Sequence, residues 1–206
     1  ERKYKMMNTA QYQDYMRDYY KYAKLNNPDV NIPEQILSNS DVNTDWQDAI
    51  FRSAPTRSYE LAASGGSDKT QYYTSIGYMQ QGGILRNSNF NRLSTRINLD
   101  HQHSEKLRFS TSINLTRAMN ERVQEENSKE GPTKSGFFMA PNLPVYTADG
   151  SYNYDNVSLS KENPVAMLKL PTNEAETFRV LANVSAEYQF IPELTLKTSF
   201  GTDLSF

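Results

Sequence analysis

The feature that most constrains the fold is a period of two in the hydrophobic pattern, which begins near Arg57 and returns in run after run. In one run, Leu93, Thr95, Ile97 and Leu99 alternate with Ser94, Arg96, Asn98 and Asp100. Similar runs cover residues 107–116, 178–190 and 194–206, with weaker ones at 57–64 and 70–80. Successive side chains of a strand point to opposite faces of a sheet. The pattern therefore predicts half-buried, antiparallel strands.

The length and spacing of these runs indicate which class of β-protein they belong to. The clearest are about 9–13 residues long, against about 5–6 for a strand in a globular protein and about 9–11 for one that crosses a membrane. Short connections (64–69, 101–106 and 191–193) alternate with long stretches (1–56, 81–91 and 119–177). Outer-membrane barrels alternate tight periplasmic turns with long extracellular loops in this way. We expect Gly65 and Gly66 to supply the positive φ of the first tight turn.

The fold class we predict is all-β, with about six long strands that form part of a large antiparallel transmembrane β-barrel. Residues 1–56 form a helical and irregular extracellular segment, 57–118 the first four strands, 119–177 a long extracellular loop and 178–206 a two-stranded hairpin. Residues 1–27 predict an amphipathic helix, with Asn8 or Thr9 as its cap and Asn26-Asn27-Pro28 as its end. A helical turn begun by Asp45 is expected near Trp46 to Phe51.

The composition excludes several kinds of function and structure. The 206 residues carry a net charge of −2, which gives no electrostatic footprint for nucleic acid. The absence of cysteine excludes disulfides and thiolate sites. No apolar stretch approaches the roughly 20 residues of a membrane-spanning helix. Aromatic residues lie near the ends of the predicted strands, where barrels carry interfacial girdles: Tyr72, Tyr78, Phe178, Tyr188 and Phe190.

Several segments, in this order, resemble the SusC/RagA type of TonB-dependent transporters. Asn43-Thr44-Asp45-Trp46 and Ala49-Ile50-Phe51-Arg52 are similar to the segment before an early barrel strand. They are followed by Ser64-Gly65-Gly66-Ser67, Gly77-Tyr78 to Gly83-Ile84, and Asn91-Arg92-Leu93 to Asp100. Pro144-Val145-Tyr146 to Tyr152, and then Glu162-Asn163-Pro164-Val165-Ala166, resemble the family's long extracellular loop. The resemblance covers roughly residues 40–206, and residues 1–27 fit it more loosely.

The resemblance implies a bacterial outer-membrane importer with a barrel of about 22 strands and an N-terminal plug. It implies uptake of oligosaccharides or peptides, energy delivered by TonB through the plug, a SusD-like surface lipoprotein as partner, and no catalysis. This chain has neither plug nor TonB box, and six strands cannot close around a plug. We therefore expect a fragment of a larger polypeptide. Two alternatives stay open: a passive outer-membrane porin, and a soluble secreted β-sandwich that binds carbohydrate.

No catalytic, cofactor-binding or metal-binding residue is predicted, and substrate-contacting residues are not assigned. His101 and His103 share a strand face, but a polar turn explains them without a metal. A solvated loop likewise explains the carboxylates Glu121, Glu125, Glu126 and Glu130. Trp46 either anchors a loop or stacks on a sugar ring. We expect the strand charges to face the plug or water inside the barrel: Arg96, Arg108, Arg179, Glu187, Lys197 and Asp203.

Overall fold

The computed structural model describes residues 3–33, 41–123, 131–154 and 162–206. The chain forms two compact units. We call the first the loop unit; it comprises Glu1–Ser53, Ile84–Asn87 and Val123–Asn173. We call the second the sheet unit; it comprises Ala54–Gly83, Ser88–Arg122 and Glu174–Phe206. Each unit contains segments that are far apart in the sequence.

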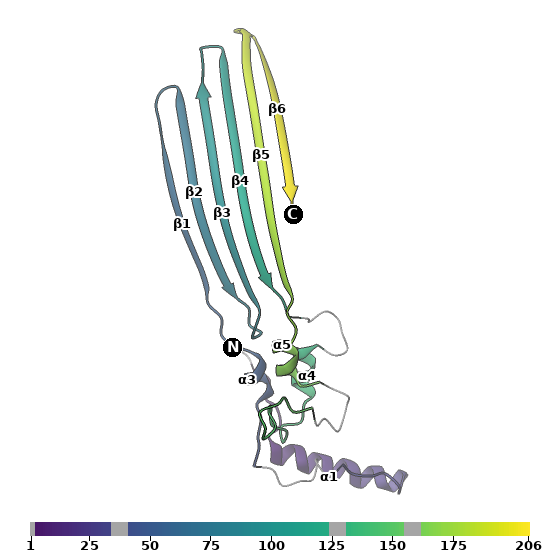
Figure 1. Ribbon diagram of the computed structural model, residues 1–206. Coiled ribbons are helices and arrows are strands. Elements are labelled where there is room, and N and C mark those ends of the chain that lie inside the picture. Colours follow the sequence, from purple (N-terminus) through teal and green to yellow (C-terminus); the bar gives the residue numbers. More distant parts are fainter. Residues whose placement is uncertain (1–2, 34–40, 124–130, 155–161) are drawn as a thin grey trace. The chain divides into compact units, whose positions relative to one another are not determined.

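The sheet unit is a six-stranded antiparallel sheet whose spatial order follows the chain, β1-β2-β3-β4-β5-β6 (Figure 1). Its strands are β1 (Thr56–Gly66), β2 (Thr70–Gly82), β3 (Asn89–Gln102), β4 (Leu107–Glu121), β5 (Glu174–Ile191) and β6 (Leu194–Ser205). β4 and β5 extend a few residues beyond the predicted runs. The backbone ladder continues through Glu121 and Glu174, which pair with each other, even though the hydrophobic alternation has ended there.

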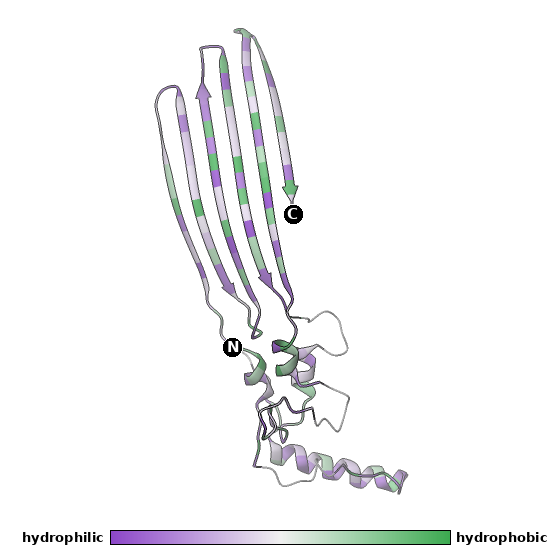
Figure 2. Ribbon diagram, viewed as in Figure 1, coloured by the Kyte–Doolittle hydropathy of each residue, from purple (hydrophilic) through white to green (hydrophobic). Residues whose placement is uncertain are grey.

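The register brings the apolar side chains of all six strands onto one face. Ile76 lies opposite Leu61 and Thr95, and Thr95 lies opposite Leu115. The row continues through Val180 to Leu204. Figure 2 shows the resulting alternation of hydrophobic and hydrophilic residues along the strands. A register slip of one residue would move every side chain of a strand to the other face. We call the two surfaces the apolar face and the polar face.

The tight turns fall where the sequence predicts them, but the glycine argument for the first turn is wrong. Gly65 and Gly66 lie within β1, and neither has a positive φ. A Cβ on Gly66 would meet the Thr70 carbonyl oxygen at 2.2 Å, and one on Gly65 would meet the Tyr72 hydroxyl at 2.7 Å. Small residues are required here because another strand passes closely, rather than because the backbone is left-handed.

The loop unit contains the helices. α1 spans Thr9–Asn26, so it begins later than the predicted range of 1–27. Asn8 starts it with a capping box: its side chain accepts the Gln11 N–H at 2.9 Å, and the Gln11 side chain accepts the Asn8 N–H at 3.1 Å. Asn27 is extended, as expected for a residue before proline.

The described residues of the loop unit also form the shorter helices α3 (Trp46–Ile50), α4 (Pro132–Phe138) and α5 (Pro164–Lys169). The predicted helical turn begun by Asp45 is confirmed, since the Asp45 side chain accepts the Asp48 N–H at 3.0 Å. Helices α4 and α5 both carry proline at their first turn, where its missing N–H costs nothing. No helix among the described residues is both long and apolar enough to cross a membrane.

Candidate functional site

Trp46 is the anchor of the loop unit. Its side chain is 4% exposed and packs with Ile50, Met139, Leu143 and Val165 in one apolar cluster. Its indole N–H donates to the Ala140 carbonyl at 3.0 Å, so the ring is held by a polar contact as well as by packing. Of the two hypotheses for Trp46, the anchor is therefore correct, since a buried ring offers no face to a sugar.

Asn163 ties three segments of the loop unit together. It is fully buried, and its Oδ1 caps α5 by accepting the backbone N–H of Val165 at 3.0 Å. Its Nδ2 donates to the carbonyls of Val145 at 2.8 Å and Asn153 at 3.0 Å. The strands on both sides of the 146–152 hairpin are thus fixed to the start of α5. The sequence marks this residue only as an Asn before a proline.

The hairpin at residues 146–152 turns as its Asp149-Gly150 pair predicts. Tyr146 bridges Tyr152, and Gly150 has a φ of +86°. Hydrogen bonds from Thr147 and from the backbone and side chain of Ser151 lower the pKa of Asp149 below its ordinary value. Lys169 donates to the Tyr146 hydroxyl at 3.1 Å, and this contact raises the Lys169 pKa.

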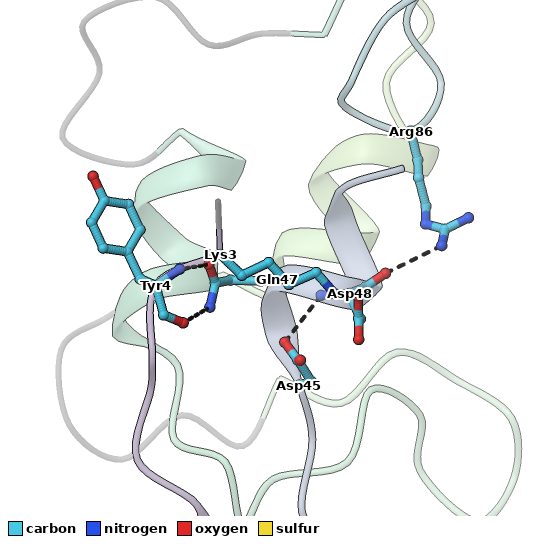
Figure 3. Close-up of polar contacts among 6 residues, drawn as sticks. All are labelled: Lys3, Tyr4, Asp45, Gln47, Asp48 and Arg86. Atoms are coloured by element: carbon cyan, nitrogen blue, oxygen red, sulfur yellow. Dashed lines mark hydrogen bonds and ion pairs between the residues drawn. The ribbon is translucent and has the colours of Figure 1, made fainter. Parts of the chain in front are cut away.

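A side-chain clamp holds the segment before α1 (Figure 3). The Gln47 amide, 4% exposed, accepts the Tyr4 N–H at 3.0 Å and donates to the Tyr4 carbonyl at 2.8 Å, as a neighbouring strand would do. Lys3 forms an ion pair with Asp48 and lowers the Asp48 pKa. Arg86 donates to the Asp48 carbonyl at 3.2 Å.

The clamp also places an aromatic ring beside a groove. Tyr4 packs edge to face on Phe137, with ring centroids 5.5 Å apart, yet the residue remains 72% exposed. The groove, about 970 Å³ in volume, lies within the loop unit between α1 and residues 136–141. Five tyrosines contribute to its lining: Tyr4, Tyr12, Tyr15, Tyr19 and Tyr20. We call it the tyrosine groove.

The strand charges that we expected inside the barrel lie on the polar face, and most are paired across strands. Arg179 binds Asp203 through two hydrogen bonds of 2.8 and 2.5 Å. The Nζ of Lys197 lies 3.9 Å from Oε2 of Glu187, and Nη2 of Arg108 lies 3.2 Å from Oδ1 of Asp100. Arg96 donates to the Asn114 side chain at 2.9 Å. The register explains these pairs, because Lys197 lies directly opposite Glu187 and Arg96 directly opposite Asn114, whereas the other two pairs are diagonal neighbours on the same face.

The remaining candidates that lie among the described residues do not form a metal site. The His101 and His103 rings are 6.1 Å apart, and His101 Nδ1 lies 2.8 Å from the Thr70 hydroxyl. Over the described residues, no three His, Cys, Asp or Glu side chains come together as a metal site would require. Glu121 accepts a hydrogen bond from Asn89 at 2.5 Å. Glu125, Glu126 and Glu130 lie outside the described residues.

Comparison with known proteins gives consistent results. The chain is 34% identical over 166 residues to TonB-dependent receptor P3 of Formosa agariphila. It is 28% identical over 183 residues to TonB-dependent receptor SusC of Bacteroides thetaiotaomicron. Each match covers 77% of this chain but only 16% and 18% of those relatives, so the chain spans about a sixth of their length. No protein-family model matches the chain.

Solved structures agree with the sequence relatives. The RagAB peptide importer in its closed-closed state matches with a TM-score of 0.65 and 25% identity, over 80% of this chain and 19% of that one. The RagAB peptide transporter matches with a TM-score of 0.68 and 23% identity, over 94% of this chain and 22% of that one. The relatives named here are receptors and importers rather than enzymes. These matches confirm the resemblance drawn from the sequence and the six-stranded antiparallel fold.

Proposed function

We propose that this chain, which belongs to the SusC/RagA type of TonB-dependent receptors, forms six strands of the wall of an outer-membrane barrel that imports oligosaccharides or peptides. The observation that carries the proposal is the continuous apolar face of the sheet. Leu61 is 76% exposed, Phe200 74% and Ile76 49%. Large contiguous apolar surfaces are rare on soluble proteins and mark contact with lipid or a partner.

The dimensions of the apolar face fit a bilayer. Phe178 and Tyr188 lie on this face near the two ends of β5, opposite Arg117 and Leu107 of β4. At about 3.4 Å per residue their separation along the strand is about 34 Å. Strands of membrane barrels tilt by about 35–45°, which reduces that length to the height of roughly 25 Å typical of the lipid-facing band. The aromatic rings would then lie at the two membrane interfaces.

The polar face fits a water-filled or plugged interior. Its charges are matched in pairs such as Arg179 with Asp203 and Lys197 with Glu187. Exposed pairs of this kind stabilise a fold only weakly. Their role in the proposal is instead to line the interior with groups that water or a plug can solvate. The charged pair on the apolar face, Arg117 with Glu176, lies at the end of that face beside Phe178. A charge in the middle of the lipid-facing surface costs about 2–4 kcal/mol.

The edges of the sheet require further strands. β1 and β6 each pair with one neighbour within the chain, and an unpaired strand edge cannot face lipid. In the proposal the remaining strands of a barrel of about 22 close on both edges. The loop unit lies on the extracellular side with residues 1–56 and 119–177, where a SusD-like lipoprotein and the substrate are met, and TonB acts through a plug.

Neighbouring residues of β4 provide a test in a receptor from which any other cysteine has been removed; these 206 residues contain none. Ile113→Cys lies on the apolar face, and Ser112→Cys is its matched control on the polar face. In full-length receptor in bacterial outer membranes, we expect a water-soluble maleimide to label Ser112→Cys and to spare Ile113→Cys. Equal labelling of both positions would contradict the barrel. Import is tested separately: uptake of labelled oligosaccharide or peptide should stop when TonB is deleted.

A further inference from the structure

We propose that the end of the apolar face that carries the tight turns binds the headgroup of a zwitterionic phospholipid through His101 and His103 (Figure 1). The inference rests on the proposed function, in which these turns lie at the periplasmic interface of the membrane. His101 lies inside β3, on the apolar face opposite Thr70 and Phe109, rather than in the turn that the sequence predicts. His103 follows two residues later, at the start of the turn to β4. We call these two residues the histidine pair.

The histidine pair lies at the depth where the proposed barrel meets lipid headgroups. The His103 N–H donates to the Leu107 carbonyl at 2.9 Å, and Leu107 lies opposite Tyr188, the aromatic residue placed at this interface. His101 lies one row further into the apolar face, because it is opposite Phe109 rather than Leu107. A headgroup at this interface is therefore within reach of both histidines, while its acyl chains cover the apolar rows beyond them.

Each ring of the histidine pair is held by a neighbour and keeps a donor for a ligand. His101 Nδ1 lies 2.8 Å from the Thr70 hydroxyl. We assign the hydrogen of the neutral His101 ring to Nε2, because the hydroxyl can then donate to Nδ1. The His103 ring packs edge to face on Phe109, with centroids 6.4 Å apart. No described residue accepts a hydrogen bond from Nε2 of His101 or from the His103 ring.

The donors of the histidine pair require an acceptor that the membrane can supply. A polar group that faces lipid without a partner is strongly unfavourable, and the phosphate oxygens of a phospholipid are strong acceptors at this depth. The two ring centroids are 6.1 Å apart. Hydrogen bonds of about 2.8 Å to two oxygens of one phosphate group can span rings at this separation. One headgroup therefore satisfies both histidines.

The charges of the adjoining turns fit a headgroup that carries both signs. Asp68 precedes Lys69 in the turn before β2, and Glu105 precedes Lys106 in the turn before β4. None of these four side chains forms an ion pair with another residue that the structure describes. The lysines can pair with a phosphate and the carboxylates with an ammonium group. Glu193 in the turn before β6 adds a further carboxylate, so an anionic headgroup without an ammonium group fits less well.

Lipid retention by the full-length receptor tests the site. Delipidated receptor in detergent, with a metal chelator present, is titrated with phosphatidylethanolamine, phosphatidylglycerol or diacylglycerol of the same acyl chains, and bound lipid is measured by mass spectrometry. We expect phosphatidylethanolamine to bind most tightly, and the double variant His101→Ala/His103→Ala to weaken it about tenfold. Gln102→Ala is the matched control, because Gln102 lies between the two histidines on the polar face. His103→Gln keeps an N–H donor and should lose less affinity than His103→Ala.

Four outcomes would overturn the proposal: binding of phosphatidylglycerol or diacylglycerol as tight as that of phosphatidylethanolamine, equal loss in Gln102→Ala and the double variant, displacement of the lipid by excess inorganic phosphate, or retention only when the chelator is left out. The third result would make the histidine pair a site for free anions, and the fourth a metal site. Labelling of Ser112→Cys and Ile113→Cys is independent of the histidine pair. Failed lipid retention with the expected labelling pattern would thus reject the headgroup site and leave the barrel standing.

Discussion

The loop unit and the sheet unit treat apolar side chains in opposite ways. In the loop unit, Ile50 is fully buried and Trp46 is 4% exposed within a common cluster. In the sheet unit, Phe200 is 74% exposed and Leu196 is 58% exposed on the apolar face. In the proposed barrel, one chain therefore contains both an apolar core and a wall that faces lipid. The hydrophobic effect stabilises the first, whereas backbone pairing holds the second in a solvent that cannot replace it.

The largest effect is expected from removing the anchor of the water-facing core. Trp46→Ala deletes a buried ring and its hydrogen bond to Ala140, and substitutions of this kind cost about 3–5 kcal/mol. We expect hydrogen exchange of α3, α4 and α5 amides in the full-length receptor to accelerate accordingly. Phe200→Ala, on the apolar face of β6, is the control and should leave these amides unchanged. If both variants loosen the helices equally, the two units are not energetically distinct.

A charge on the apolar face of the sheet unit tests whether that face meets lipid. Ile113→Arg places a guanidinium in the middle of the apolar face and should lower the free energy of unfolding from lipid by about 2–4 kcal/mol. Urea titration of receptor folded into vesicles measures this change. The control Ser112→Arg, one residue away on the polar face, should cost far less. Similar losses at both positions would mean that the apolar face does not meet lipid.

The loss of the Asn163 amide should have an intermediate effect that stays within the loop unit. Asn163→Ala removes the amide donor from the Asn153 carbonyl and one of the two donors of the Val145 carbonyl, which keeps the Asn153 N–H, and it removes the α5 cap. Each buried group left unsatisfied costs about 1–3 kcal/mol. We expect faster exchange in residues 145–153 and in the first turn of α5. Unchanged exchange in both segments would show that water replaces the amide fully.

The smallest effect concerns pH. The pKa of Asp149 is lowered in the folded hairpin by Thr147 and Ser151, so the ionised carboxylate stabilises the turn. That contribution is complete above the ordinary pKa of 3.8 and is lost as pH falls through the lower, folded value. Titration of the Asp149 carboxyl by NMR should give a midpoint below 3.8, and Asp149→Asn should abolish the transition. A midpoint at or above the ordinary value would contradict the hydrogen bonds.

The sequence predicts the structure of the sheet unit better than that of the loop unit. Alternation along each strand specifies which side chains share a face, and short turns specify the pairs β1–β2, β3–β4 and β5–β6 from local information. The pairs β2–β3 and β4–β5 are joined by longer connections. The helix caps Asn8 and Asp45 are also local signals. The ends of β4 and β5 have no such local signal, because their backbone pairing continues beyond the residues that alternate in hydrophobicity.

The contacts that organise the loop unit depend on segments distant in sequence. Gln47 meets Tyr4, Trp46 meets Ala140, and Asn163 meets Val145. A glutamine next to a tryptophan carries no signal that it will hold another segment as a strand would. The tyrosine groove was missed for a related reason. The spacing of Tyr12, Tyr15 and Tyr19 predicts one face of α1, but it cannot say whether that face meets protein or remains open.

The pairing order of the sheet allows its loops to change in evolution while its strands keep the same neighbours. β4 and β5 lie side by side although residues 122–173 separate them in the chain. Loop closure entropy grows only with the logarithm of length, by about 0.6 kcal/mol for each doubling. A connection of this size is a few doublings longer than a tight turn. Its closure therefore costs only a few times that amount of free energy. New recognition surfaces can be inserted between neighbouring strands, enlarged or exchanged, while the wall that carries them keeps the same register.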